Sequence, residues 1–404
     1  MQQTRTAHRR NLTTGVSTRL PEYQGNSILN LMATVIRACG GASPHQELAA
    51  LPSRELKSAR RLVYLVLDGL GAIQLRRHLA DEQGTAFFAR HPHYILTSVY
   101  PATTAAAVTT FATGASPAEH AILGWHLNLP DLGLVSTILP AITRTRTPVA
   151  PPDFNLGAYL ELPRPIETVR RTRALLSWGH IPASRYSLAG PHWHQRRAYS
   201  TLTGMERAIL DFARAPGRGL AYAYWPDYDS LCHEFGCDHR RVTLHFRRMD
   251  ETLARIARGL KGTGTTLLIT ADHGLIDASP AHRVELRDVP GLLDCLATLP
   301  AGDARQVHCF VRPSMESQFL AIVRKRLAPA CRIVPGREAI RNGWFGPGKP
   351  HPALTARCGD YLLVARGDYA FGTRLPGQKP DFNEANHGGT SAREMLVPLY
   401  TVRS

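Results

Sequence analysis

Apolar residues form several short, nearly continuous runs along the chain. Residues 61–67 (RLVYLVL), 220–225 (LAYAYW) and 265–270 (TTLLIT) are of this kind, as are 361–365 (YLLVA) and the more polar 94–100 (YILTSVY). Runs of this length predict strands, and an unbroken apolar character is typical of strands that are buried on both faces. The pattern therefore predicts a sheet that is covered on each side.

Helical spacing of apolar residues appears before and between these strands. Residues 26–39 repeat apolar positions every three or four residues, with Ser27 at the N-cap position. Residues 104–111 are rich in alanine and end near Gly114, and 242–260 carry a long helical pattern. Because buried strands that alternate with helices form parallel sheets, we expect an α/β fold with a mostly parallel central sheet flanked by helices on both faces.

The composition changes along the chain and indicates how it is organised. Residues 275–385 are rich in proline and glycine, so we expect a smaller cap to be inserted there into one main domain, 26–404. Residues 128–170 also resemble loops and are expected to border a cleft. The polar and basic residues 1–25 are predicted to form a flexible tail.

Length and cysteine content limit the class of protein. The chain has 404 residues, 44% of them hydrophobic, which is enough to bury a large core. No apolar run approaches the roughly 20 residues that span a bilayer, and the N-terminus shows no apolar signal segment. Seven unevenly spaced cysteines argue against a disulfide framework. These features predict a cytoplasmic protein without membrane contact.

The net charge of +16 favours anionic partners. The arginines are dispersed in isolated doublets, and none of them belongs to a recognisable nucleic-acid-binding module. We therefore expect the charge to attract small phosphorylated substrates and predict no specific nucleic acid as a partner.

Acidic and histidine residues follow two of the predicted strands. Asp68 comes directly after 61–67, and Asp272 and His273 follow 265–270. Ligands of open α/β sheets sit beyond the carboxyl ends of the strands, so one sheet edge is expected to gather these side chains. An isolated Asp-Gly is also an ordinary turn signal, so Asp68 indicates a site only in combination with Asp272 and His273.

Asp229 and His233 stand four residues apart, which on a helix places their Cβ atoms about 5–6 Å apart on one face. A surface Asp–His pair has the same spacing, and a lone histidine such as His387 is often structural. Together the pieces offer two sets of ligands, Asp68, Asp272 and His273 for one metal ion and Asp229, His233 and His387 for another. Such donors suit two divalent ions, zinc above all, and two adjacent ions are typical of phosphoryl chemistry.

A pair of threonines stands where the strand at 94–100 gives way to the helix at 104–111. A hydroxyl at this junction lies at the sheet edge, and its target phosphate can meet the free N–H groups of the helix start. Because a threonine hydroxyl is unreactive at its ordinary pKa, it needs a metal ion to become a nucleophile. Thr103 or Thr104 is therefore a nucleophile, an N-cap, or both.

Taken in order, these elements resemble the type I phosphodiesterase/nucleotide pyrophosphatase family of the alkaline phosphatase superfamily. The shared elements are strand-Asp-Gly, Pro-x-x-Thr…Thr-Gly, Asp-x-x-x-His-x-x-Gly, Ala-Asp-His-Gly and His-Gly-Gly, and they extend from about residue 60 to the C-terminus. The resemblance implies that Thr104 attacks phosphorus, bridges to one of two zinc ions and carries a phospho-threonine intermediate. It also implies the metal ligands grouped above, Asp68, Asp272 and His273 beside Thr104, and Asp229, His233 and His387 at the other ion.

The activity implied by the resemblance is hydrolysis of phosphodiester or pyrophosphate bonds in nucleotide-like substrates. Ala107 stands where many members carry an asparagine that holds a phosphate oxygen. Trp125, Trp193 and Tyr228 either form a stacking wall for the substrate or belong to the core. The alternatives are a phosphomonoesterase, a phosphonate (C–P) hydrolase, or a catalytically silent metal- and phosphate-binding protein. The absence of a Cys-x-Pro-x-Arg motif argues against a sulfatase.

Overall fold

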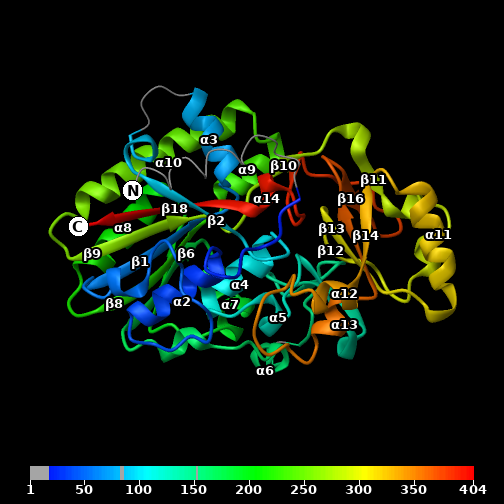
Figure 1. Cartoon of the computed structure of the whole chain (residues 1–404), viewed down its shortest axis with the longest axis horizontal. Helices are drawn as coiled ribbons and strands as arrows, with labels where there is room; N and C mark the ends of the chain where they lie inside the picture. The colour runs from blue at the N-terminus through cyan, green and yellow to red at the C-terminus, as the bar shows by residue number, and fades with distance from the viewer. Residues whose placement is uncertain (1–17, 82–85, 152) are drawn as a thin grey trace.

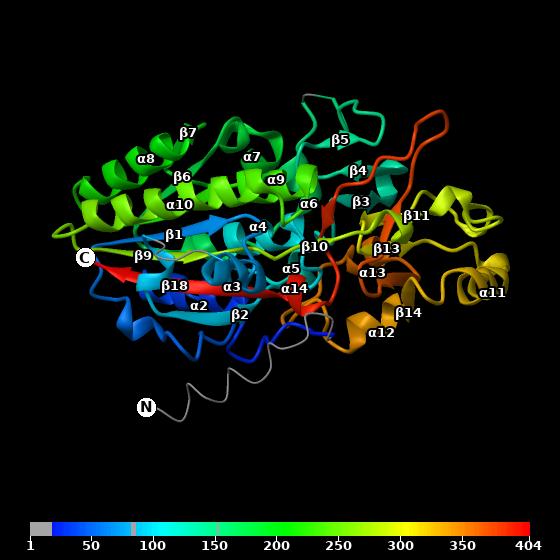
Figure 2. The same ribbon diagram turned by 90° about the horizontal axis from the view of Figure 1, so that it is seen from above.

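Two seven-stranded sheets organise the chain (Figure 1). The computed structural model describes residues 18–81, 86–151 and 153–404. The first sheet carries the helices of the main domain, and the second lies beside one end of it (Figures 1 and 2).

The first sheet follows the strand order β2-β18-β9-β1-β8-β6-β7. In that order its strands are β2 (His93–Thr97), β18 (Leu396–Arg403), β9 (Thr265–Thr270), β1 (Arg61–Leu67), β8 (Gly219–Trp225), β6 (Thr172–Trp178) and β7 (Gln195–Tyr199). The strands from β9 to β7 pair in parallel, whereas β18 pairs antiparallel with both β9 and β2. The predicted α/β class is confirmed, and the sheet is only partly parallel because its C-terminal strand runs against its neighbours.

Helices lie on both faces of the first sheet. The α-helices of the described residues are α2 (Ile28–Ala38), α3 (Ala72–Asp81), α4 (Thr104–Thr113), α5 (Pro117–His120), α6 (Leu156–Leu160), α7 (Arg185–Ala189), α8 (Leu202–Arg214), α9 (Asp227–Phe235), α10 (Arg240–Gly259), α11 (Glu316–Arg326), α12 (Gly336–Arg341), α13 (Leu354–Cys358) and α14 (Ala392–Met395). In Figure 1, α3, α9 and α10 lie above the sheet, and α2 and α4 lie below it. The helices predicted at 26–39, 104–111 and 242–260 are α2, α4 and α10, and Ser27 caps α2 as expected.

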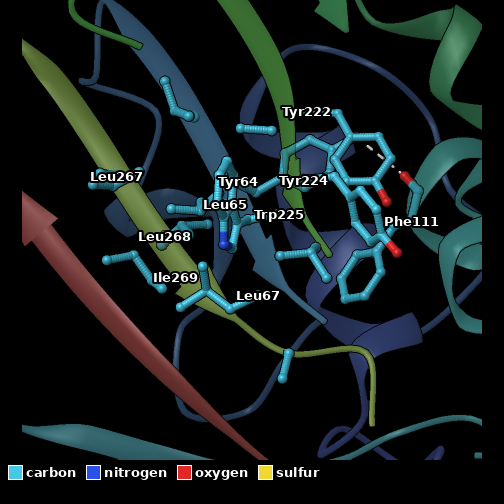
Figure 3. Packing of buried hydrophobic residues seen from close by; sticks show 14 of the residues in the cluster. Tyr64, Leu65, Leu67, Phe111, Tyr222, Tyr224, Trp225, Leu267, Leu268 and Ile269 are labelled. Atoms are coloured by element: carbon cyan, nitrogen blue, oxygen red, sulfur yellow. Dashed lines mark hydrogen bonds between the residues drawn. The ribbon is translucent and has the colours of Figure 1, made fainter. Parts of the chain in front are cut away.

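Tyr64 lies at the centre of the core of the first sheet. Its strand, β1, is buried along its whole length. Tyr64 stacks on Tyr222 of β8 with 5.0 Å between the ring centroids, and its hydroxyl donates to the carbonyl oxygen of Phe111 in α4 at 3.1 Å (Figure 3). Leu65 is fully buried on the opposite face, because successive residues of a strand point to opposite sides. Both faces of the central strand are therefore covered, as its apolar sequence predicts.

The second sheet is antiparallel and follows the order β14-β15-β13-β12-β3-β4-β5. Its strands are β14 (Cys331–Pro335), β15 (Tyr361–Ala365), β13 (Gln306–Cys309), β12 (Ala301–Asp303), β3 (His126–Leu129), β4 (Leu134–Thr137) and β5 (Ile142–Thr143). It combines two segments that are distant in the sequence. β3 to β5 come from residues 126–143, and β12 to β15 come from residues 301–365. The loop-like character predicted for 128–170 is wrong for β4 and β5, whose short strands carry too few residues for a periodic pattern.

Two small strand pairs join the second sheet to the first domain. β10 (Ile276–Asp277) pairs antiparallel with β17 (Ala385–Asn386), so the ends of the proline- and glycine-rich segment meet. β11 (Arg283–Glu285) pairs in parallel with β16 (Ala370–Gly372). The segment 275–385, which we expect to form a cap, therefore begins and ends at one place.

The N-terminal tail predicted at 1–25 lies outside the described residues as far as residue 17. From residue 18 the chain follows the domain surface, where Thr18 bridges to Ser391 and the hydroxyl of Tyr23 donates to the carbonyl oxygen of Trp344 at 3.0 Å. In the described parts of the chain, no helix combines the length and the apolar character needed to cross a membrane.

We expect Leu65→Ala to lower the free energy of unfolding by about 2–5 kcal/mol, because it leaves a cavity in a fully buried strand of the central sheet. Urea unfolding followed by circular dichroism measures the change. A loss below about 1 kcal/mol would contradict the central position given to β1.

Candidate metal centre and active site

Two neighbouring parallel strands deliver carboxylates to the same sheet edge. Asp68 directly follows β1, and Asp272 follows β9 after one intervening residue. The backbone N–H of Gly69 donates to Oδ1 of Asp272 at 3.1 Å, which fixes the two loops side by side. The hydroxyl of Tyr224, near the end of β8, donates to Oδ2 of Asp68. The sheet edge therefore gathers these groups as the strand pattern predicts.

His273 and Thr104 complete the first half of the site. The Nε2 atom of His273 lies 3.4 Å from Oδ1 of Asp68 and 3.5 Å from Oδ2 of Asp272. It also lies 3.0 Å from Oγ1 of Thr104, the first residue of α4. Thr103 occupies the N-cap position, but its side chain forms no capping hydrogen bond with the described residues. The threonine that reaches the cluster is therefore Thr104.

Helix α9 brings the second half of the site. Oδ2 of Asp229 lies 3.1 Å from Nε2 of His233, one turn further along the helix. Nδ1 of His233 donates to the carbonyl oxygen of Ala385 at 2.7 Å, which directs Nε2 towards Asp229 and the cluster. Nε2 of His387 lies 3.9 Å from Oδ1 of Asp229, and its ring stacks on that of His273 with 3.8 Å between centroids.

All seven predicted site residues thus lie in one cluster, but His273 is shared. Ligand atoms within 4.8 Å of one another form two groups, Asp68, Asp272 and His273, and Asp229, His273 and His387. His233 contacts Asp229 without joining the second group. The assignment of each ligand to a particular ion stays a prediction.

Three carboxylate oxygens in this cluster are buried without a hydrogen-bond donor among the described residues: Oδ1 of Asp68, Oδ1 of Asp229 and Oδ2 of Asp272. Burial, followed by repulsion from Asp272 and Asp229, raises the pKa of Asp68 well above its usual range. Burial also raises the pKa of Asp272. Unpaired buried carboxylates are costly, and carboxylate oxygens and imidazole nitrogens are common ligands of divalent metal ions. The residues therefore fit a divalent metal ion.

A glycine allows the two halves to meet. Gly69 has φ +74°, and a Cβ atom added to it would lie 2.9 Å from Cβ of Asp229. Any larger residue would separate the loop after β1 from α9. The Asp-Gly pair is therefore required by the packing of the site and is more than a turn signal.

A cleft of about 1520 Å³ opens beside the cluster. The main domain contributes Thr104 and Trp193 to its wall, and the second-sheet side contributes Trp125, Arg144 and Asp303. Trp125 is 40% exposed, whereas Tyr228 is fully buried in the core and is not part of a stacking wall.

Ala107 belongs to the apolar core, where it is fully buried. Ala107 therefore offers no group that could hold a phosphate oxygen in place of the asparagine that many family members carry. Tyr224, which orients Asp68, is not singled out by the sequence because it reads as an ordinary residue of an apolar strand. Arg144 and Asp303 are missed because only the second sheet brings them to the cleft.

A partly parallel α/β sheet whose edge collects aspartates and histidines beside a helix-terminal threonine defines the class of alkaline-phosphatase-like hydrolases. The chain belongs to the type I phosphodiesterase / nucleotide pyrophosphatase family, which it matches over residues 62–390. The resemblance drawn from the motifs is thereby confirmed, and the family supports a hydrolase of phosphoric esters. No curated protein sequence is significantly similar to the chain.

Solved structures share the fold at low sequence identity. Murine ectonucleotide pyrophosphatase / phosphodiesterase 5 has a TM-score of 0.63 at 16% identity, over 84% of this chain and 87% of its own. Phosphonoacetate hydrolase from Sinorhizobium meliloti 1021 has a TM-score of 0.61 at 18% identity, over 86% of this chain and 91% of its own. At these identities the likeness establishes the fold.

The pair of His233 and Asp229 makes the stability of the metal-free protein depend on pH. Burial opposes the charged imidazole, but attraction to Asp229 outweighs it and raises the pKa of His233 from 6.5 to about 9. A raised histidine pKa stabilises the fold fully below the unfolded pKa, and this contribution is lost as the pH rises through the folded value. We therefore expect wild type to lose more unfolding free energy between pH 6.5 and 9 than His233→Asn does. Chemical denaturation of both proteins at several pH values checks this, and parallel profiles would contradict it.

Proposed function

We propose that the chain is a metal-dependent hydrolase that cleaves phosphodiester or pyrophosphate bonds of nucleotide-like substrates through Thr104. The observation that carries the proposal is the position of Thr104, whose Oγ1 lies 3.0 Å from Nε2 of His273. The same Nε2 atom lies within 3.5 Å of a carboxylate oxygen of Asp68 and of Asp272. A hydroxyl buried against this ligand cluster is placed to act as a nucleophile.

The cluster is suited to hold two divalent ions, and zinc is the ion that its donors favour. Asp68, Asp272 and His273 would hold the ion beside Thr104, and Asp229, His233 and His387 the other. When bound, two such ions lower the pKa of a nucleophile and neutralise the charge that develops on the phosphoryl oxygens. The remaining work belongs to the chain, which must orient the substrate and exclude water.

Thr104 is placed for an in-line attack at a helix start. The first N–H groups of an α-helix have no partner within it, and Thr104 is the first residue of α4, so a phosphate bound to Thr104 would lie at a helix N-terminus. Attack by Oγ1 forms a phospho-threonine and releases the leaving group, and a water molecule then hydrolyses this ester. Because Ala107 lies in the core, these N–H groups and the ions would carry the negative charge.

The size and lining of the cleft favour a substrate with two substituents on phosphorus. Its volume of about 1520 Å³ exceeds the roughly 300–1000 Å³ of common small-molecule sites. Trp125 offers an exposed ring at the wall, and Arg144 and Lys379 add positive charge to the lining. The murine neighbour has been solved in complex with AMP, which accords with a nucleotide-like substrate.

A phosphonate hydrolase is the second candidate. The same positive charges of Arg144 and Lys379 suit a small dianionic substrate. The structural neighbour from Sinorhizobium meliloti 1021 is a phosphonoacetate hydrolase, solved with phosphonoacetate. A phosphomonoesterase would need the cluster alone and no wide cleft.

We expect Thr104→Ala to lower turnover by more than about a thousandfold while the ions stay bound, because the nucleophile is lost and the ligands remain. The matched control is Thr103→Ala, which removes the neighbouring hydroxyl and should keep turnover within about tenfold of wild type. Hydrolysis of bis-p-nitrophenyl phosphate and p-nitrophenyl phosphate is measured for all three proteins.

A Thr104-dependent preference for the diester supports a phosphodiesterase. Preference for the monoester moves the protein to the phosphatases, and release of phosphate from phosphonoacetate alone supports the second candidate. Undiminished turnover in Thr104→Ala refutes the nucleophile assignment, and a wild type inactive on every substrate favours the silent binding protein.

We expect His387→Ala to lose one ion in preference to the other, because His387 contacts Asp229 and stacks on His273 without approaching Asp68. Metal analysis after dialysis measures the ions retained per chain. Unchanged metal content would show that His387 is no ligand.

A further inference from the structure

Three ligand-bearing loops meet at the short helix α14. The backbone N–H of Gly274, next to His273, donates to the carbonyl oxygen of Glu394 at 2.8 Å. The backbone N–H of Gly389, two residues after His387, donates to Oε1 of the same residue at 2.8 Å. A Cβ atom added to Gly71, in the loop after Asp68, would lie 2.6 Å from Cα of Gly274. The three loops are therefore packed against one another around Glu394.

The Glu394 carboxylate is fully buried and has more partners than a helix cap requires. It forms the capping box of α14, in which the backbone N–H of Ser391 donates to Oε2 at 3.3 Å, and the hydroxyl of Ser391 also donates to Oε2 at 2.6 Å. Oε1 additionally receives the N–H of Gly389. A Cβ atom added to Gly389 would lie 2.8 Å from Oε1, so only glycine permits this approach. The carboxylate thus holds the loop of His387 directly.

The charge of Glu394 is balanced by an arginine from the second sheet. Arg305, in the turn between β12 and β13, donates through Nε to Oε1 and through Nη2 to Oε2, each at 3.1 Å. Its side chain is 1% exposed, and it also donates to the carbonyl oxygen of Tyr369. From the same hairpin, Asp303 packs against Gly388, where an added Cβ atom would lie 3.0 Å from Cβ of Asp303. The hairpin therefore clamps the loop that follows His387 from the side of the second sheet.

A buried ion pair is weak as a source of stability, because desolvation of the two charges offsets much of their attraction. Its geometry here has another consequence: the pair fixes Glu394, which accepts the N–H of Gly389 in the His387 loop and the N–H of Gly274 next to His273. Ligands of a metal site must be held within about 0.5 Å of the productive arrangement by the residues behind them.

We propose that Glu394 and Arg305 are positioning residues that set His387 and His273 at the spacing a divalent ion requires, and that they tie the second sheet to the metal centre. This inference rests on the proposed function, since it assumes that the cluster binds metal. It adds two residues that touch neither the ion nor the substrate.

The test is zinc binding by the metal-free protein, measured by isothermal titration calorimetry with no substrate. We expect Glu394→Gln to weaken binding at one of the two sites by about 10–100-fold, the usual loss when a group behind a ligand is removed. Arg305→Lys keeps the charge but loses the paired contact, so we expect a smaller loss at the same site. Arg305→Met, which leaves the carboxylate unpaired, should lose more than Arg305→Lys.

Asp250→Asn is the matched control for general loosening of the fold. Asp250 is a buried carboxylate that accepts the N–H groups of Phe87 and Phe88 at 3.1 and 2.8 Å, away from the ligand loops. Its loss should lower stability and leave zinc affinity unchanged.

Wild-type zinc affinity in both Glu394→Gln and Arg305→Lys would overturn the proposal, as would an equal loss of affinity in Asp250→Asn. A wild-type protein that binds no zinc would overturn the proposed function instead. Hydrogen exchange in the metal-free wild type needs no variant. We expect the amides of Gly274 and Gly389 to exchange as slowly as those of β1, and rapid exchange at either glycine would contradict the role of Glu394.

Discussion

The mutual repulsion of three buried carboxylates is the constraint on which the rest of the site depends. Asp68, Asp229 and Asp272 each leave one oxygen without a donor among the described residues, inside the cluster that His273 and His387 complete. Such an arrangement is unfavourable in a folded chain unless positive charge occupies the space between the oxygens. Metal binding would therefore be coupled to folding, because the chain assembles the ligands and a bound ion would remove the cost of assembling them.

The scaffold explains how carboxylates from distant segments reach one point. β1 and β9 are adjacent and parallel, so Asp68 and Asp272 emerge at the same edge. The following glycines let the loops approach α9 and α14 closely. The second sheet completes the cleft with Trp125 and Arg144 and reaches behind the ligands through Arg305. The main domain thus supplies the candidate metal ligands, whereas the second sheet supplies part of the cleft lining and the arginine behind the ligands.

The sequence was informative wherever local pattern and burial agree. β1 and β9 have the predicted bounds because both are buried along their whole length and end at or just before an acidic residue. The convergence of Asp68, Asp272 and His273 followed from the order of strands and motifs. The sharing of His273 between two groups did not, since it depends on how the His387 loop packs. β18 has no clear signal because Pro398 interrupts an inner strand, and β5 has only 2 residues. Ala107 looked like a missing catalytic group, but the helix turns this position into the core.

The most direct test of this account is anomalous diffraction from crystals of the protein grown with zinc. The account predicts two peaks inside the cluster, with ligand atoms at about 2.0–2.2 Å. One peak should contact Asp68, Asp272 and His273, and the other should contact Asp229, His233 and His387. A cluster that stays empty at saturating zinc, or a single peak away from these side chains, would contradict a two-metal centre built around Thr104.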